Sequence, residues 1–441
     1  MPASRSSRKP RRLLKGCFAV GCGGPFVLLI ILFVVFTLNN RPSDIKVPTP
    51  VQPVNNAYND FIRASQMVST IVHKSPSSMQ SPPAGREAYI AQTKACTEES
   101  ASALSVLRSG FSKPYVPKPV RSLQDSMQDL PITQGFRELS RTISGVGTYY
   151  ELTGQNLKWA DTLLDGEEMG VMIPHGGALI ADLVGIASEN ISLSRFEQVL
   201  PLLKSDELAH VARRLEAIQS KRAKYSDILL EDSYVGVSLV QETMNDPKNR
   251  GLQAYWQGLK ESFSSNNSGG GPPGPGPAEV LREMFQNKTD MLSEQLTAYR
   301  ELALEAEKPY TTNPNIKNHS QLFAIMASTL VQGRGKHMAM ESGVNILRLE
   351  TALFQYKLSK GRFPSQLAEL ASGYLQAIPL DPFTGASNKP YHYTLNPGGG
   401  FTLYGVGSDM VDHGGKFGRY VGDAGCDIVA GHISRTRKLF P

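Results

Sequence analysis

The chain has 441 residues, 40% of them apolar, with 40 Gly, 29 Pro and a formal net charge of +6. This length provides ample material for a buried core, and the high Gly and Pro content predicts folded parts joined by irregular stretches. The charge comes from six cations ahead of residue 16, so the remainder is close to neutral and indicates no nucleic-acid partner.

Residues 16–38 contain no charged side chain and are almost purely Val, Leu, Ile and Phe from Phe26 onward. About 20 helical residues cross the roughly 30 Å hydrocarbon core, so this run predicts a single transmembrane helix. The positive-inside rule places the basic tail, residues 1–15, in the cytoplasm and the rest of the chain beyond the inner (cytoplasmic) membrane, as a periplasmic or other extracytoplasmic part. A cleaved signal peptide is the alternative, but residues 38–41 lack a small-x-small cleavage site, which favours an uncleaved anchor.

A proline-rich stretch follows the predicted anchor, and residues 39–56 are expected to form a semi-rigid spacer. Over residues 57–332, apolar side chains recur at three- and four-residue steps, which predicts an extracytoplasmic helical domain. The Gly/Pro-rich segment 264–277 interrupts this domain as a flexible loop. It contains a G-x-G-x-x-G match, but no strand precedes it, so we expect no dinucleotide site there.

Within the helical domain, the apolar pattern predicts individual helices over residues 86–109, 178–190, 194–204 and 207–230. A further helix is expected over 344–359, after a break that Gly333 and Gly335 allow. The stretch from Tyr149 to Leu164 resembles a tetratricopeptide-type helix pair. Because no period of about 34 residues is present, an ordinary helical hairpin is favoured.

The sequence pattern changes after Gly361. Residues 391–395 and 401–406 alternate like strands on either side of a Gly-rich loop, which predicts a small β-hairpin or meander. We therefore expect a small α+β module over residues 344–429, in which the apolar stripe of Val344–Ser359 covers the sheet, followed by a tail over 430–441. The predicted fold class is mainly α with this module at the C-terminal end.

The order of six short motifs in this module resembles the globular head of the major pseudopilin of type II secretion. They are a helix ending in Gly361-Arg362-Phe363-Pro364, Leu367-x-x-Leu370, Asp381-Pro382-Phe383, a Tyr-containing strand, the run from Phe401 to Asp409, and a Gly/Asp-rich tail. The resemblance covers about a fifth of the chain. It implies a connection with a type II secretion-like apparatus, although the stem helix is not continuous with the N-terminal apolar run as it is in that family.

The tail of the module contains the candidate metal ligands, which are Asp409, Asp412, Asp423 and Asp427. Calcium takes six to eight oxygen ligands, and neighbouring glycines allow backbone carbonyls to turn inward. The resemblance implies that Asp409 and Asp412 bind calcium as a structural ion. Asp423 and Asp427 align less surely. The alternative is a solvated loop in which Asp and Gly form turns.

Catalytic motifs are missing from the sequence: there is no H-E-x-x-H, no G-x-S-x-G and no phosphate-binding loop. His175-Gly176-Gly177 predicts a turn between helices. The acidic pairs Glu167–Glu168 and Asp161/Asp165 are expected on a solvated helix face. Cys96 and Cys426 could form a disulfide in an oxidising compartment, but two separate thiols are slightly favoured.

These observations predict a membrane-anchored interaction or structural protein of the cell envelope. Such a protein would bind a protein partner and would not be an enzyme, and the sequence identifies no small-molecule substrate. The alternative is an envelope hydrolase whose site is built from residues far apart in the sequence and is not visible as a motif.

Overall fold

The computed structural model describes residues 42–69, 85–193, 195–246, 286–315, 321–371, 373–416, 418 and 425–430. The chain divides into two compact units. One comprises residues 1–46 and 240–294, and the other comprises residues 47–239 and 295–441. The second unit contains the sheet and every cavity discussed below.

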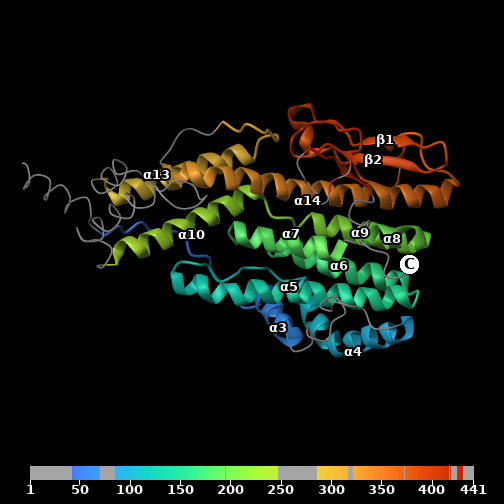
Figure 1. Cartoon of the computed structure of the whole chain (residues 1–441), viewed down its shortest axis with the longest axis horizontal. Helices are drawn as coiled ribbons and strands as arrows, with labels where there is room; N and C mark the ends of the chain where they lie inside the picture. The colour runs from blue at the N-terminus through green and yellow to red at the C-terminus, as the bar shows by residue number, and fades with distance from the viewer. Residues whose placement is uncertain are drawn as a thin grey trace, which may run out of the picture. The chain divides into compact units, whose positions relative to one another are not determined.

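Helices dominate the described residues (Figure 1). They are α3 (Ala57–Ser69), α4 (Arg86–Gly110), α5 (Leu123–Leu152), α6 (Asn156–Met172), α7 (Leu179–Leu193), α8 (Phe196–Val199), α9 (Ser205–Gln219), α10 (Tyr225–Asn245), α13 (Lys288–Ala306) and α14 (Gln321–Lys360). Short 3-10 turns are η3 (Leu200–Leu202), η6 (Leu367–Ala371) and η7 (Pro382–Ser387). An antiparallel sheet has the order β1 (His392–Leu395), β2 (Phe401–Gly405), β3 (Ile428–Val429). A mostly helical fold with a small sheet is confirmed.

The predicted transmembrane helix requires a correction. In the part of the chain that the structure describes, no helix is long and apolar enough to cross a membrane. The longest of them, α5 and α14, carry charged side chains along their length, which lowers their hydropathy below that of a span. The predicted span at residues 16–38 and the tail at 1–15 lie outside the described residues. The inner-membrane location and the anchored fold class depended on that span, and both are withdrawn.

Besides a cluster that joins α10, α13 and α14 around Tyr299, two apolar clusters hold the helical layers of the second unit together. The first joins α3, α4 and α5 through buried side chains that include Phe61, Leu107 and Leu139. The second joins α6, α7, α9 and α14 around Leu164 and Leu347, among others. The α5–α6 pair, predicted as a helical hairpin, turns at Gly154, which has a φ of +70°.

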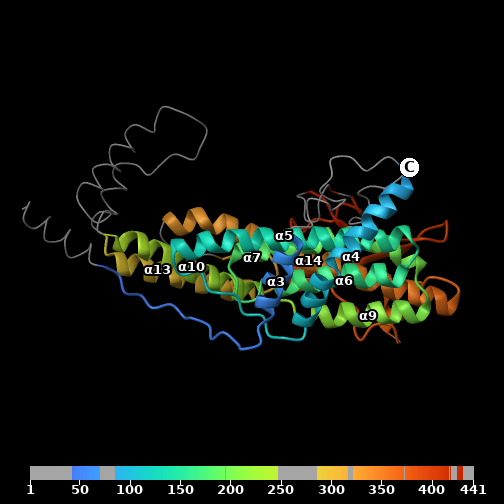
Figure 2. The same cartoon turned by 90° about the horizontal axis from the view of Figure 1, so that it is seen from below.

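Helix α14 lies between the sheet and helices α7 and α9 (Figures 1 and 2). Its side chains Ile346, Leu349 and Leu353 pack in one cluster with Leu403 of β2 and Ile428 of β3. The apolar stripe of Val344–Ser359 therefore covers the sheet as predicted. Residues of α14 also pack in the helical cluster, so the domain boundary expected between residues 332 and 344 falls inside one continuous helix.

The predicted helix over residues 207–230 is wrong, because α9 ends at Gln219 and α10 begins at Tyr225. No Gly or Pro marks the intervening turn in the sequence. Burial explains the break: the turn allows Arg222 to enter the interior, where it meets the carboxylates of Glu189 and Glu167. A tertiary ion pair, rather than local propensity, sets this helix end.

The break expected at Gly333 and Gly335 is also wrong, because α14 runs through both residues. A Cβ added at Gly333 would lie 2.4 Å from Tyr225 Oη and 2.8 Å from Leu179 Cδ1. Tyr225 is held in place by its hydrogen bond to the Leu330 carbonyl, at 2.6 Å. Gly333 thus serves close packing of α14 rather than helix termination.

We expect Gly333→Ala to lower the free energy of unfolding by about 1–3 kcal/mol, because the added methyl group overpacks the contact with Tyr225. Urea denaturation of the full chain measures the change. Gly335→Ala is the matched control. Its new Cβ would come no closer than 3.3 Å to Tyr310 Oη, so a helix-propensity gain of up to about 1 kcal/mol is expected to offset any crowding. Equal losses in the two variants would contradict the packing explanation.

Candidate functional site

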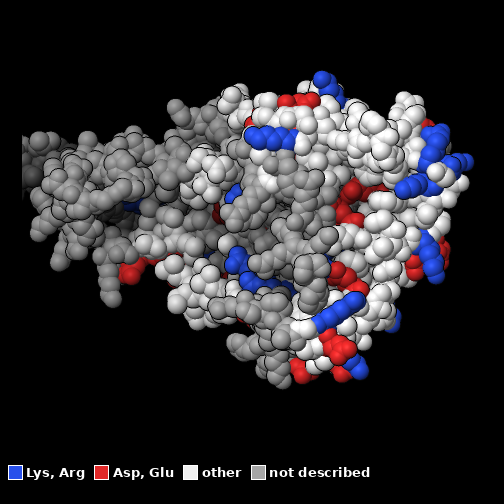
Figure 3. Space-filling model, turned by 45° about the vertical axis from the view of Figure 1, so that its right-hand side comes forward, with Lys and Arg blue, Asp and Glu red and all other residues white. Residues whose placement is uncertain are grey.

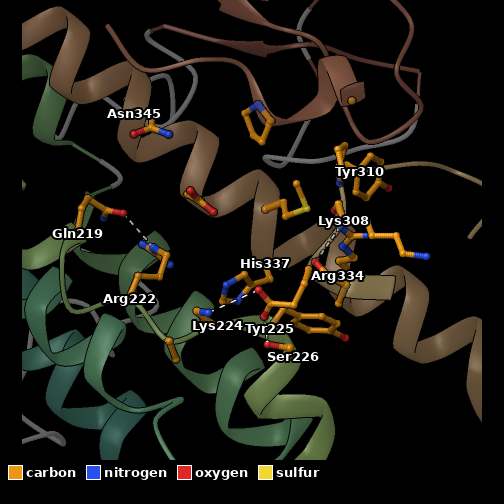
Figure 4. Close-up of a pocket in the computed structure, with 18 of the residues that line it drawn as sticks. Gln219, Arg222, Lys224, Tyr225, Ser226, Lys308, Tyr310, Arg334, His337 and Asn345 are labelled. Carbon is orange, nitrogen blue, oxygen red and sulfur yellow. Dashed lines mark hydrogen bonds and ion pairs between the residues drawn. The ribbon is translucent and has the colours of Figure 1, made fainter. Parts of the chain in front are cut away.

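A cavity of about 660 Å³ opens between the α9–α10 turn, the end of α13, α14 and η7 (Figure 4). Its ionisable lining comprises five cationic side chains against two carboxylates, together with one histidine. The cations are Arg222, Lys224, Lys308, Arg334 and Arg348, and the carboxylates are Glu307 and Glu341. Figure 4 shows Arg334 beside Tyr310 and Lys308 at one end, and Arg222 beside Gln219 at the other.

The wall contributed by α14 is a stripe of polar side chains along one face of the helix. Arg334, His337, Glu341, Asn345 and Arg348 follow one another at steps of three or four residues, which places them on one helical face. All five line the cavity. This spacing is present in the sequence and could have identified the wall, but the apolar stripe on another face of the same helix is the stronger periodic signal.

Arg334 is the most buried of the cavity's cations, with 7% of its surface exposed. Its Nη2 donates to the carbonyls of Ala306 at 3.0 Å and Lys308 at 2.5 Å, so it caps the C-terminal end of α13. The guanidinium lies 5.4 Å from the centre of the Tyr310 ring. Burial lowers the pKa of Arg334. Among the described residues, no carboxylate lies within ion-pair distance of it.

Arg222 connects the cavity to buried carboxylates behind it. Its guanidinium forms a close bidentate contact with Glu189 and lies 3.5 Å from Glu167 Oε1. Both glutamates are almost fully buried. Burial and the Glu189 charge raise the pKa of Glu167, whereas Glu189 raises the pKa of Arg222 against the opposing effect of burial. One guanidinium thus lies against two buried carboxyl groups, and burial together with the neighbouring Glu189 favours the protonated form of Glu167.

A buried acid–histidine pair lies at the cavity wall. His337 Nδ1 is 2.7 Å from Asp182 Oδ1, and both side chains are almost completely buried. Such a pair orients an imidazole as a base would be oriented in an enzyme. Ser226 lines the same cavity, but its hydroxyl donates to Glu307 and not to His337. The arrangement lacks a hydroxyl nucleophile in contact with the base among the described residues.

The lysines at the mouth of the cavity are largely exposed. Lys224 lies 3.5 Å from Glu307, and Lys308 lies 2.5 Å from Glu305, with 69% and 62% of the two lysine side chains exposed. Exposed pairs of this kind contribute little to stability, so both lysines remain available to a ligand. Elsewhere on the described surface, charges of both signs are interspersed on the face shown in Figure 3.

The predicted metal ligands organise the tail through hydrogen bonds. Asp427 accepts from the backbone N–H of His413, Gly415 and Lys416, and Asp409 accepts from His413 Nε2 at 2.9 Å. Asp412 accepts from Gly414 N at 2.8 Å and from Tyr404 Oη at 3.2 Å. Asp423 lies outside the described residues. Among the described residues, no three acidic, His or Cys side chains group as metal ligands, and calcium binding stays a prediction.

The expectation of a solvated acidic face on α6 is wrong. Asp165, Glu167 and Glu168 are buried. Arg214 of α9 pairs with Asp161 at 2.9 Å, Asp165 at 3.1 Å and Glu168 at 3.3 Å, and Arg108 pairs with Asp165 at 2.7 Å. These partners come from distant parts of the sequence, so the one-dimensional pattern could not reveal them.

Two smaller predictions are also tested. His175-Gly176-Gly177 lies in the turn between α6 and α7, as expected, with a φ of +62° at Gly176. No disulfide joins Cys96 and Cys426 in the described part of the chain, and Cys96 is buried in α4. Both cysteines are therefore free thiols in this structure.

No protein-family model, curated protein or solved structure matches this chain. The pseudopilin resemblance of residues 344–429 therefore stays a prediction, and the cavity must be interpreted from its own chemistry.

The raised pKa of Glu167 predicts a pH dependence of stability. The folded chain retains a proton at pH values where an unfolded glutamate, with its ordinary pKa of 4.5, has lost it. The free energy of unfolding therefore falls as the pH rises from 4.5 toward the raised pKa. Glu167→Gln removes this loss, and its amide can donate to Glu189. We expect a stability gain on the order of 1 kcal/mol at pH 8, measured by urea denaturation between pH 5 and 8.

Glu168→Gln provides the matched control on the same helix. It removes contacts with Lys221 at 2.5 Å and Arg214 at 3.3 Å and is expected to leave stability at pH 8 unchanged or lower. A loss of stability in Glu167→Gln at pH 8 would show that Glu167 is ionised in the folded chain.

Proposed function

We propose that this protein is a non-enzymatic binding protein whose cavity holds the carboxylates of an acidic segment in a partner protein. The observation that carries the proposal is Arg334, a buried guanidinium that borders a large cavity and has only carbonyl and aromatic neighbours at close range. A guanidinium retains donors in a fork that matches a carboxylate. Glu305 and Glu307 act on Arg334 from a distance, but neither forms an ion pair with it, so a carboxylate from outside could become its direct partner.

The mouth of the cavity supports a chain-like ligand rather than a single small ion. Lys224 and Lys308 are largely exposed beside Arg334, on two different connections. An extended acidic segment could place one carboxylate against Arg334 and its neighbours against the lysines. Arg348 is less available, because Glu216 Oε1 and Asn345 Oδ1 each accept from it at 2.9 Å.

A hydrolase is the second candidate, and the Asp182–His337 pair is the observation that favours it. It is less well supported, because the hydroxyl of Ser226 is engaged by Glu307. A binding role needs no nucleophile and uses the charges that are present.

We expect tetraglutamate to bind the full chain at low ionic strength and tetraglutamine to bind much more weakly, as measured by isothermal titration calorimetry. Arg334→Gln is expected to weaken tetraglutamate binding by about tenfold, because it removes a charge-assisted fork in a poorly solvated site. Lys308→Gln should weaken it by a smaller factor, and added salt should reduce the difference from wild type.

Lys336→Gln is the matched control, because Lys336 is exposed on α14 and does not line the cavity. It removes the same charge and should leave binding unchanged. Lys308→Gln also guards against loss of folding in Arg334→Gln, since the side chain of Lys308 lies at the surface. Equal binding of the two peptides, or equal effects of Lys336→Gln and Arg334→Gln, would contradict the proposal.

A connection of the partner with a type II secretion-like apparatus is a further proposal. Its basis is the motif order between Gly361 and Asp412, and a helix covered by a small antiparallel sheet is the fold that this motif order implies. Crosslinking in intact cells of the source organism, followed by mass spectrometry, tests the connection. Recovery of a secretin or a pseudopilin is expected, whereas recovery of unrelated proteins alone would remove it.

A further inference from the structure

A second cavity, of about 260 Å³, lies on the other side of α10 and differs in chemistry from the first. It is enclosed by α3, the connection between α4 and α5, α5 itself, the α6–α7 turn and α10. Most of its lining is apolar or aromatic, and includes Tyr58, Tyr115, Pro117, Phe136, Ile173 and Ile180. Since one water takes about 30 Å³ in the liquid, the cavity has room for a group of several heavy atoms.

The walls are held in position by hydrogen bonds between the Asn56 side chain and the backbone and by close packing at Gly176. Asn56 accepts from Val116 N at 3.1 Å and donates to the Val116 carbonyl at 2.7 Å, which fixes the proline-rich connection against the start of α3. Gly176 adopts a φ of +62°, and a Cβ there would lie 3.2 Å from Pro117. The cavity is therefore part of the packed fold and does not depend on a loop closing over it.

Asp129 is the charged group whose carboxylate remains unmatched in this cavity. No hydrogen bond or ion pair to Asp129 exists among the described residues. Burial raises the pKa of Asp129, and its charge adds to the effect of burial in raising the pKa of Tyr58 to about 12. Asp129 is partly exposed and lines the cavity together with Tyr58, Tyr115 and Phe136, so its carboxylate lies beside the aromatic wall.

The other charges at this cavity have partners. Glu231 pairs with Arg121 at 2.7 Å, and both side chains are largely buried. Lys118 pairs with Asp125 at 2.8 Å and donates to Gln128 at 3.2 Å, so its ammonium group is engaged by side chains of α5. The remaining charge is one negative carboxylate in apolar surroundings. Such a site favours a cation over a neutral or anionic ligand.

The aromatic walls favour a particular class of cation. Tyr58 and Tyr115 lie with ring centres 5.7 Å apart and planes at 88°, and Phe136 lies 6.5 Å from Tyr58 at 79°. All three residues line the cavity, so a cation inside it would lie among aromatic rings. Ring faces attract cations, and alkylated ammonium groups lose less hydration than metal ions when they enter an apolar site.

We propose that this cavity binds an alkylammonium group, with Asp129 as its counter-ion and Tyr58, Tyr115 and Phe136 as its walls. The proposal is independent of the anion-binding cavity, with which it shares no lining residue. The alkylammonium group could belong to a free small cation or to a lysine side chain of a protein.

An exposed apolar stripe leads away from the cavity along α5. Leu123, Met127 and Leu130 recur at steps of four and three residues, and they are 52%, 73% and 63% exposed. Leu130 also lines the cavity. A lysine flanked by apolar residues would place its side chain in the cavity and its neighbours on this stripe.

Choline and its neutral isostere 3,3-dimethyl-1-butanol test the class of ligand, because they share a shape and differ in charge. Isothermal titration calorimetry with the full chain is expected to detect choline and to show binding of the alcohol weaker by about tenfold or more. Equal binding of the two compounds would show an apolar cavity without selection for charge. Failure of both choline and the lysine peptide described below to bind would overturn the proposal.

Asp129→Asn is expected to weaken choline binding by about tenfold while preserving or raising the melting temperature, because it removes a poorly solvated charge. Asp125→Asn is the matched control: it removes a carboxylate one turn earlier on α5 that already pairs with Lys118. If either variant fails to fold, two other measurements test the proposal. They are the loss of choline binding expected in Tyr115→Leu and the comparison of choline with the neutral alcohol on the wild-type chain. Unchanged binding in Asp129→Asn would overturn the role of its carboxylate.

The source of the cation is distinguished with acetyl-Leu-Lys-Leu-amide and acetyl-Leu-Gln-Leu-amide. Tighter binding of the lysine peptide than of choline, with loss of affinity in Met127→Ser, would assign the cation to a protein partner. Tighter binding of choline, with no effect of Met127→Ser, would assign it to a free small cation. Both outcomes require that Asp129→Asn weakens binding.

Discussion

Burial of α14 on two faces is the constraint on which the rest of the second unit depends. Val344 and Leu347 are fully buried in the helical cluster, and Leu349 and Leu353 are fully buried against the sheet. Each such side chain contributes about 1.5–3 kcal/mol relative to its exposed state. Because one rigid helix belongs to both cores, the helical layers and the C-terminal sheet cannot separate without exposing both. The sheet is too small to be stable without this support.

The same constraint explains where polar chemistry can occur. A helix that is covered by a sheet on one side and by helices on another has limited surface left for charged side chains. On α14 one such surface runs from Arg334 to Arg348 and forms one wall of the first cavity. Arg334 also caps α13, so the same side chain stabilises the fold and lines the cavity. A guanidinium fixed by backbone carbonyls loses little further freedom when it meets a carboxylate, which favours binding.

Periodicity and turn residues in the sequence were sufficient to predict those elements whose structure depends on local interactions. The helix over 86–109, the turn at His175-Gly176-Gly177 and the strands on either side of Gly398 follow from periodicity and turn chemistry, and the structure has them. The same patterns gave wrong predictions where a residue distant in the sequence determines the local structure. Gly333 indicated a helix break, yet the helix continues through it, and the missing side chain gives room for Tyr225 to pack against α14. Glu167 indicated a solvated face, yet Arg222 and Glu189 bring it into the interior. No single-sequence pattern contains these pairings, since the partners are separated by many residues and several helices.

The two cavities are chemically opposite, and the segments that divide them explain why they can remain so. Tyr225 and Ser226 of α10 line the first cavity, while Glu231 and Val235, two turns further on, line the second. Between them, Asp232 accepts from Leu179 N and from Tyr299 Oη, both at 3.1 Å, and so fixes α10 to the start of α7 and to α13. Asp182, one turn into α7, is bonded to His337. A ligand that moved these helices at one cavity would change the wall of the other cavity. By linkage, binding at each cavity would then change the affinity of the other by the same factor. With the partition held by buried hydrogen bonds, Arg334 and Asp129, neither of which forms an ion pair among the described residues, are kept apart, and each can meet a ligand of opposite charge.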